Sequence, residues 1–313
     1  MMKIPFKAFV AATVLSAIGI GSAMAQDKPT IALVTKSLAN EFHQTLLNGA
    51  VEDQKSRSNE YDLIANGIKN EGDVSGQIKL VEQMIVRKVD ALVLAPADSK
   101  ALVPVVKKAI DAGILVINID NALDRDTLKS KDIHLPFVGP SNRKGAELVG
   151  AYMADRMTKG DKVAIIEGIP TAENAQQRTL GFQDAMKAAE MNVVSLQSGQ
   201  WEIDKANTIA SSLLTEYPDL KGILCGNDSM AIGAVAAVKS AGKTGEVLVV
   251  GFDNLAAVQP MIEDGRLLAS VEQFGAKLGV YGIDVALKAL KDKTPQNKID
   301  ALIETPVELA IKK

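Results

Sequence analysis

Cysteine and histidine are scarce in this sequence. Its 313 residues contain one cysteine, Cys225, and two histidines, His43 and His134. A single cysteine excludes an intramolecular disulfide framework and every multi-cysteine metal site, and two histidines leave little for zinc. We therefore expect neither a metal ion nor a cofactor. Cys225 ends an apolar run, which indicates an inert buried thiol.

Basic charge is also lacking. The formal net charge of the whole chain is −3, and it becomes −5 without residues 1–25, because these hold two lysines and no acid. A mildly acidic protein lacks the sequence-independent attraction to phosphate on which nucleic-acid binding depends. We therefore expect no nucleic-acid partner. Aromatic residues make up only 4% of the chain, so an aromatic side chain in a connecting loop indicates a function.

Long apolar runs are missing except near the N-terminus. Lys3 and Lys7 precede an uncharged apolar run over residues 8–20, and Ala23 and Ala25 supply small residues for cleavage. This pattern predicts a secretory signal peptide over residues 1–25. The run is too short for a membrane span, which needs about 20 apolar residues. With no cysteine at the cleavage site to carry a lipid, we expect a soluble protein exported to the periplasm.

Apolar runs alternate with helical spacers through the rest of the chain. Runs at 31–34, 63–65, 91–94 and 114–119 have no polar alternation, as is typical of parallel strands buried on both faces. A helix is expected over 73–87. The regular spacers predict an α/β fold with doubly wound parallel sheets.

A second series of apolar runs follows a break. Residues 121–140 are rich in charge and contain Gly139 and Pro140, so we expect them to cross from one unit to another. Further runs occur at 163–166, 193–194, 223–224 and 247–250. Two lobes of similar size follow, which agrees with a typical domain length of about 100 to 200 residues.

Ligands of open parallel sheets bind in the loops beyond the carboxyl ends of the strands. Those loops carry carboxylates, amides, an arginine and flat aromatic faces, without a nucleophile placed beside a base. Sugars need this mixture, because their hydroxyl groups donate to Asp and accept from Arg and Asn while their C–H faces lie on aromatic carbon. The candidate residues are Lys36, Asn40, Phe42, His43, Asp120, Asn121, Arg178, Trp201, Asn227, Asp253 and Gln273.

Four separated motifs resemble one family. They are IALVTKSLANEFH at 31–43, CGNDSMAIG at 225–233, VLVVGFDN at 247–254 and SVEQ at 270–273. In this order they are similar to the periplasmic sugar-binding proteins of the ribose and allose type. The resemblance implies a clamshell of two lobes joined by a hinge of three crossings, with residues 26–139 and 274–303 in the N-terminal lobe and 140–273 and 304–313 in the C-terminal lobe. It also implies that the loaded form docks on an ABC permease.

The resemblance assigns roles to single residues. Asn40 and Phe42 match the positions that hydrogen-bond and stack on the sugar, and Asp120 matches a carboxylate that binds hydroxyl groups. Arg178 matches the arginine that grips ring and hydroxyl oxygens, and Trp201 matches the opposing aromatic side chain. The remaining matches are polar: Asn227, Asp253 and Gln273 complete the ring, and Lys36 resembles the lysine of the allose type.

Two positions depart from the ribose pattern. His43 stands where a second stacking aromatic is expected, and Asn121 stands where the ribose type has an arginine and the allose type a glutamate. His43 is therefore a candidate donor to an extra hydroxyl group. A hexopyranose, a pentose or an open-chain sugar alcohol all remain open as the ligand.

Plain structural roles compete with these assignments. Phe42 also fits the core, Trp201 a surface anchor, and Asp120, Asn227 and Asp253 helix caps or turns. Arg178 and His43 also fit exposed positions.

Two other functions compete with a binding protein. A sugar-responsive repressor would need a helix-turn-helix before residue 31, and only five residues separate Ala25 from Ile31. An exported sugar-processing enzyme would need two carboxylates at one glycosidic bond, for which Asp120 and Asp253 stay candidates. We expect a monomeric binding protein without catalysis, and leave open whether a chemotaxis receptor also recognises it.

Overall fold

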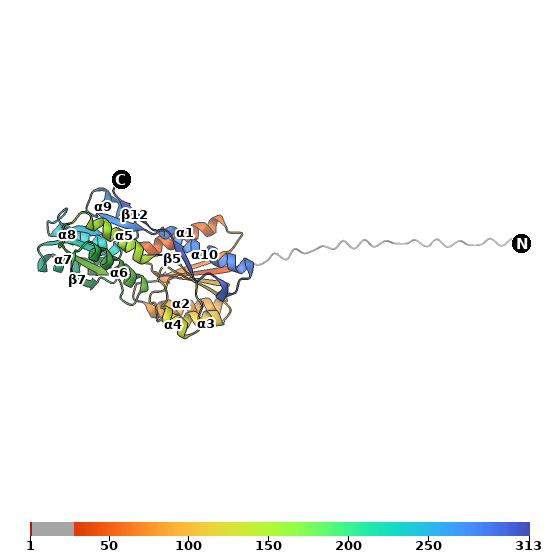
Figure 1. Cartoon of the computed structure of the whole chain (residues 1–313). Coiled ribbons are helices and arrows are strands. Elements are labelled where there is room, and N and C mark those ends of the chain that lie inside the picture. The colour runs from red at the N-terminus through yellow and green to blue at the C-terminus, as the bar shows by residue number, and fades with distance from the viewer. Residues whose placement is uncertain (2–27) are drawn as a thin grey trace.

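The structure, a computed structural model, describes Met1 and residues 28–313. Apart from Met1, the predicted signal peptide lies outside the described residues. Two six-stranded sheets organise the described chain (Figure 1). The first sheet contains β1 (Thr30–Ser37), β2 (Asp62–Ile68), β3 (Ala91–Leu94), β4 (Leu115–Ile119), β5 (Phe137–Pro140) and β11 (Leu302–Thr305). The second contains β6 (Lys162–Glu167), β7 (Asn192–Ser198), β8 (Leu220–Cys225), β9 (Leu248–Val250), β10 (Ala269–Glu272) and β12 (Glu308–Ile311).

Both sheets have the doubly wound strand order. The first runs β11-β5-β4-β3-β1-β2 and all of its pairs are parallel. The second runs β12-β10-β9-β8-β6-β7, and only β12 is antiparallel to its neighbour. Register places Ile31 opposite Ala91 and Val34 opposite Leu94. The predicted fold class, two parallel-sheet α/β lobes, is confirmed.

Helices cover both faces of the first sheet. They are α1 (Glu41–Ser56), α2 (Val74–Arg87), α3 (Val103–Asp111), α4 (Arg125–Ser130) and α10 (Gly275–Asp292), and a short 3-10 turn, η1 (Gln296–Lys298), follows. Ile31 and Leu33 pack with Leu46 of α1, whereas Val34 packs with Val81 of α2. Successive side chains of a strand point to opposite faces, so an unbroken apolar run fills two layers of core.

The second sheet is covered in the same way. Its helices are α5 (Asn142–Ala154), α6 (Glu173–Ala188), α7 (Ile203–Glu216), α8 (Asp228–Ser240) and α9 (Gln259–Glu263). Ile165 packs with Phe182 of α6, while its neighbour Ile166 belongs to the core that includes Leu213 of α7. Cys225 is fully buried at the end of β8, as predicted.

The chain passes between the two sheets three times. β5 lies in the first sheet, and α5 after it packs against β9 and β10 of the second. The chain returns from β10 to α10, and it crosses again from β11 to β12. The stretch 121–140, expected to be only a crossing, also contains α4 and β5. β5 escaped prediction because it is four residues long and ends in Gly139 and Pro140, which indicate a turn.

Among the described residues, no helix has the length and apolar character needed to span a membrane.

Candidate functional site

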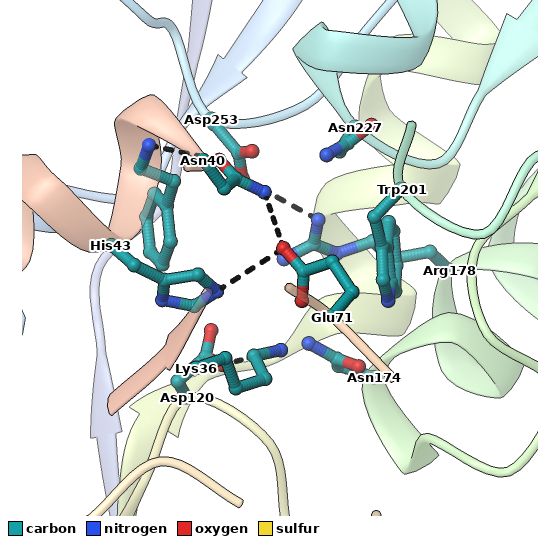
Figure 2. A pocket seen from close by; sticks show the side chains of 11 residues that line it. Lys36, Asn40, His43, Glu71, Asp120, Asn174, Arg178, Trp201, Asn227 and Asp253 are labelled. Carbon is teal, nitrogen blue, oxygen red and sulfur yellow. Dashed lines mark hydrogen bonds and ion pairs between the residues drawn. The ribbon is translucent and has the colours of Figure 1, made fainter. Parts of the chain in front are cut away.

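A small cavity lies where loops of the two lobes face each other (Figure 2). The residues that line it are Lys36, Asn40, Phe42, His43, Glu71, Asp120, Asn174, Arg178, Trp201, Asn227 and Asp253.

The carboxyl ends of the strands bring these side chains together. Lys36 lies near the end of β1, and Asp120 follows β4 directly. In the other lobe Asn227 comes two residues after β8, and Asp253 comes three residues after β9. Parallel strands present their carboxyl ends at one edge, so residues far apart in sequence share one cavity.

Three residues of the cavity have left-handed backbone conformations. The φ angles are +62° at Asp120, +68° at Trp201 and +119° at Asp253. Such conformations are costly for residues other than glycine and persist only where the surrounding structure enforces them. They turn the backbone sharply, so neighbouring side chains leave in different directions. Gly168 leaves room for the Trp201 side chain, because a Cβ atom at residue 168 would lie 2.1 Å from the indole ring.

Lys36 and Asp120 form a buried ion pair. Lys36 Nζ lies 2.9 Å from Asp120 Oδ2, and both side chains are almost inaccessible to solvent. Burial alone would raise the pKa of Asp120, but Lys36, together with His43 and Arg178, outweighs it and the pKa is lowered. Asp120 is therefore ionised, and its carboxylate oxygens can accept hydrogen bonds.

Asn40 connects α1 to the loop after β2. As the N-cap of α1, its Oδ1 accepts from the backbone N–H of Phe42 at 3.0 Å. Its Nδ2 donates to Glu71 Oε1 at 2.8 Å. Burial raises the pKa of Glu71, while Lys36 and the Asn40 hydrogen bond oppose that rise.

His43 is buried rather than exposed. Its Nδ1 lies 3.0 Å from the Thr35 hydroxyl oxygen. Burial, followed by the charge of Lys36, lowers the pKa of His43 to about 3. The imidazole is therefore neutral at neutral pH and offers one N–H donor.

Arg178 of α6 is held by partners within the second lobe. Its Nε donates to Asn142 Oδ1 at 2.8 Å, and its Nη1 donates to the Gly226 carbonyl at 2.9 Å. The same Nη1 lies 3.4 Å from Asp253 Oδ1. A planar guanidinium held in this way presents its remaining N–H groups in a fixed fork.

Asp253 is the carboxylate of the second lobe. Its Oδ1 accepts from Gln273 Nε2 at 2.6 Å. Burial raises the pKa of Asp253 to about 7, because it outweighs the opposing effect of Arg178. The neighbouring Asp228 plays a structural part: its carboxylate accepts from the Ser270 hydroxyl at 2.7 Å and from the Leu255 N–H at 2.9 Å.

Aromatic rings come from both lobes. Phe42 of α1 meets His43 edge to face, with centroids 5.2 Å apart. Trp201 of the second lobe is only 5% exposed, so it is not a surface anchor, and its Nε1 has no hydrogen-bond partner. Lys36 Nζ lies 5.8 Å from the Trp201 ring centroid and links the two lobes electrostatically.

Two predicted site residues do not line the cavity. Gln273 lies behind Asp253 and donates to it. Asn121 has other partners: its Nδ2 donates to the Pro96 carbonyl, and its Oδ1 accepts from the backbone N–H of Asn174 in the other lobe. Both residues are fully or almost fully buried.

Two lining residues were not among the predicted contacts. Glu71 lies in the loop after β2, and Asn174 lies in the first turn of α6, where its Oδ1 has no hydrogen-bond partner. The sequence offered one indication of their role, because both residues follow strands of the predicted sheets. Asn227 is both a helix cap and a lining residue of the cavity. Its Oδ1 caps α8 by accepting from the Met230 N–H, and its Nδ2 faces the cavity (Figure 2).

The described residues contain no group of three or more His, Cys, Asp or Glu side chains arranged to hold a metal ion. The cavity instead combines hydrogen-bond donors and acceptors of both signs with two flat apolar faces.

Two α/β lobes around a polar cavity are typical of solute-binding proteins. The chain belongs to the family of the periplasmic binding protein domain, whose profile matches residues 31–294. It is 57% identical over 315 residues to the D-ribose/D-allose-binding protein of Pseudomonas aeruginosa, with 99% of each chain covered. The predicted resemblance to the ribose and allose type is thereby confirmed.

Solved structures agree with this assignment. An ABC transporter solute-binding protein from Burkholderia multivorans, crystallised with an unknown ligand represented as α-D-erythrofuranose, has a TM-score of 0.88 and 62% identity, covering 90% of this chain and 99% of that one. A periplasmic solute-binding protein of an ABC transporter from Actinobacillus succinogenes, with bound D-allose, has a TM-score of 0.84 and 34% identity, covering 91% and 98%.

Proposed function

We propose that this protein is the periplasmic binding component of an ABC sugar importer and that it binds a monosaccharide or sugar alcohol in the cavity between its lobes. The observation that carries the proposal is the composition of the cavity: Phe42 and Trp201 come from opposite lobes, and charged and amide side chains surround the space they border. The similarity to the D-ribose/D-allose-binding protein makes these two sugars the first candidates.

Each group has a role in this proposal. Arg178 donates to the ring oxygen or a hydroxyl oxygen, and Asp120 and Asp253 accept from hydroxyl groups. Hydrogen bonds to charged groups contribute roughly 1.5 to 3 kcal/mol each before ordering costs. A few of them suffice for micromolar affinity, which corresponds to about −8 kcal/mol.

Closure would follow from contacts made by both lobes. The two bodies in this proposal are residues 26–139 with 274–303 and residues 140–273 with 304–313, which move about the three crossings. A ligand that contacts both bodies binds the closed state more tightly and shifts the population towards it. The permease then recognises the closed shape, with the protein acting as a monomer.

No catalysis is part of this proposal. The carboxylates of Asp120 and Asp253 already pair with Lys36, Arg178 and Gln273. In this proposal the ligand is released from the protein chemically unchanged. The exported location rests on the family and on the predicted signal peptide. A chemotaxis receptor stays an additional candidate partner.

Isothermal titration calorimetry against pentoses, hexoses and sugar alcohols tests the proposal, with chromatography of the recovered sugar as the test for turnover. We expect one site per chain, binding of D-ribose or D-allose at micromolar affinity or better, and recovery of unchanged sugar. Absence of binding across the panel, or conversion of a sugar, would contradict it.

A further inference from the structure

Glu71 brings an unsatisfied carboxylate oxygen to the cavity. Its side chain is only 7% exposed. Oε1 accepts from Asn40, but the buried Oε2 has no hydrogen-bond partner among the residues that the structure describes. Leaving a buried polar atom unpaired costs about 1 to 3 kcal/mol, and more for a charged group, so such atoms in folded proteins call for an explanation. A ligand that donates a hydrogen bond here would remove that cost.

His43 faces the same carboxylate across a gap. Its Nε2 lies 4.0 Å from Glu71 Oε1, which is beyond the roughly 2.7 to 3.2 Å of a protein hydrogen bond. Its other ring nitrogen is engaged with Thr35. Figure 2 shows the imidazole and the carboxylate directed towards each other. His43 Nε2 and Glu71 Oε1 are therefore too far apart to hydrogen-bond directly to each other.

A hydroxyl group can bridge this pair, because an oxygen about 2.8 Å from both Nε2 and Oε1 is compatible with their separation of 4.0 Å. When the Thr35 hydroxyl donates to Nδ1, Nε2 carries the proton and donates outward. A hydroxyl oxygen can accept that hydrogen bond while its own proton goes to Glu71. A methyl group would leave both partners unpaired, and a ligand carboxylate has no proton to donate to Glu71.

We propose that His43 and Glu71 form a subsite that holds one hydroxyl group of the ligand between them. The proposal rests on the proposed function, since it takes the ligand to be a sugar in this cavity, and it adds a specificity element that neither aromatic face supplies. A sugar with a hydroxyl group at this position is retained, and the same sugar without that group is discriminated against.

The test uses calorimetric titration of the mature protein with D-ribose, D-allose and their monodeoxy derivatives. Glu71→Gln keeps the size of the side chain but replaces an acceptor with a donor, and His43→Phe restores the aromatic residue expected from the ribose pattern. Glu52→Gln on the same helix as His43 is the matched control, because its side chain is 70% exposed. Circular dichroism checks folding, and His43→Gln replaces His43→Phe if that variant does not fold.

We expect Glu71→Gln and His43→Phe each to weaken binding of the parent sugar at least about tenfold, while Glu52→Gln stays within twofold. One monodeoxy derivative lacks the hydroxyl group that the subsite holds. The variants and the wild type should bind that derivative with equal affinity, and they should differ in affinity for every other derivative. If the wild type binds sugar but both variants keep its affinity, or if the loss is equal for every derivative, the subsite is overturned. If the wild type binds no sugar of the panel, the proposed function falls and the subsite falls with it.

Discussion

The guanidinium carbon of Arg178 lies 3.6 Å from the centroid of the Phe252 ring. Phe252 immediately precedes Asp253, so one short segment after β9 supplies both the surface on which the arginine rests and the carboxylate beside it. Stacking on Phe252, together with hydrogen bonds to Asn142 and Gly226, leaves the guanidinium little freedom. Ordering this side chain therefore costs little when a ligand binds.

Arg178→Lys should weaken sugar binding at least about tenfold, even though the charge is kept. A lysine ammonium is a point charge, so it cannot stack on Phe252 while presenting a planar fork of donors. Calorimetric titration measures the loss. Arg143→Lys is the control, because the Arg143 side chain is half exposed and pairs with Asp184. Equal affinities for Arg178→Lys and the wild type would refute the assigned role.

Trp201 should report ligand binding by its fluorescence. It is the only tryptophan of the chain, and it borders the cavity. Adding a bound sugar and closing the lobes changes the surroundings of the indole, so its emission should change with the same dissociation constant that calorimetry gives. Trp201→Phe should abolish the signal while retaining part of the affinity. Unchanged emission at saturating sugar would contradict the position assigned to Trp201.

Asn121→Ala should weaken binding by roughly five- to tenfold for every sugar alike. In the closed form Asn121 Oδ1 accepts from the Asn174 N–H and from the Ser99 hydroxyl, so it joins the lobes without lining the cavity. The alanine variant leaves that N–H unpaired only when the lobes are closed. Calorimetry with several sugars and small-angle scattering of the ligand-free variant measure both effects.

Losses confined to one sugar would contradict this account of Asn121 and would support the direct ligand contact predicted from the sequence. Ser130→Ala is a suitable control, since Ser130 is exposed and its hydroxyl bonds only to a backbone carbonyl of α4.

Stability should depend on pH through His43. Lys36, Asp120, Arg178 and Glu71 surround it, and burial holds its pKa near 3 instead of the ordinary 6.5. Between these values the unfolded chain binds a proton that the folded protein does not, so stability falls as the pH falls below 6.5. Relative to His43→Gln, the wild type should lose roughly 1 kcal/mol of unfolding free energy per pH unit.

Urea denaturation of both proteins at several pH values between 7.5 and 4 measures this difference. A constant difference over that range would show that His43 titrates alike in the folded and unfolded states, contrary to its burial beside Lys36.

The sequence predicted the fold well because the interior strands are unbroken apolar runs. β1, β3 and β4 are buried on both faces, and their patterns admit few alternatives. β2 was predicted only over 63–65 because it is an edge strand, half exposed, with Asn66 and Gly67 in its second half. Because the predicted strand ended too early, the loop after β2 was placed too early as well, and Glu71 was not recognised as part of it.

Asn121 shows a different limit. Its place in the sequence beside Asp120 suggests a shared cavity, but its side chain bonds to the Pro96 carbonyl and to the backbone N–H of Asn174 and does not line the cavity. Residue types and spacing do not encode such long-range partners. The unpartnered oxygen of Glu71 and the gap to His43 likewise depend on three-dimensional contacts that no local pattern contains.

A crystal structure of the protein with D-ribose or D-allose tests the central claim most directly. The account predicts that the sugar ring lies between Phe42 and Trp201, with hydroxyl or ring oxygens hydrogen-bonded to Arg178 and Asp253. A sugar bound elsewhere, with neither aromatic face in contact with it, would contradict the account.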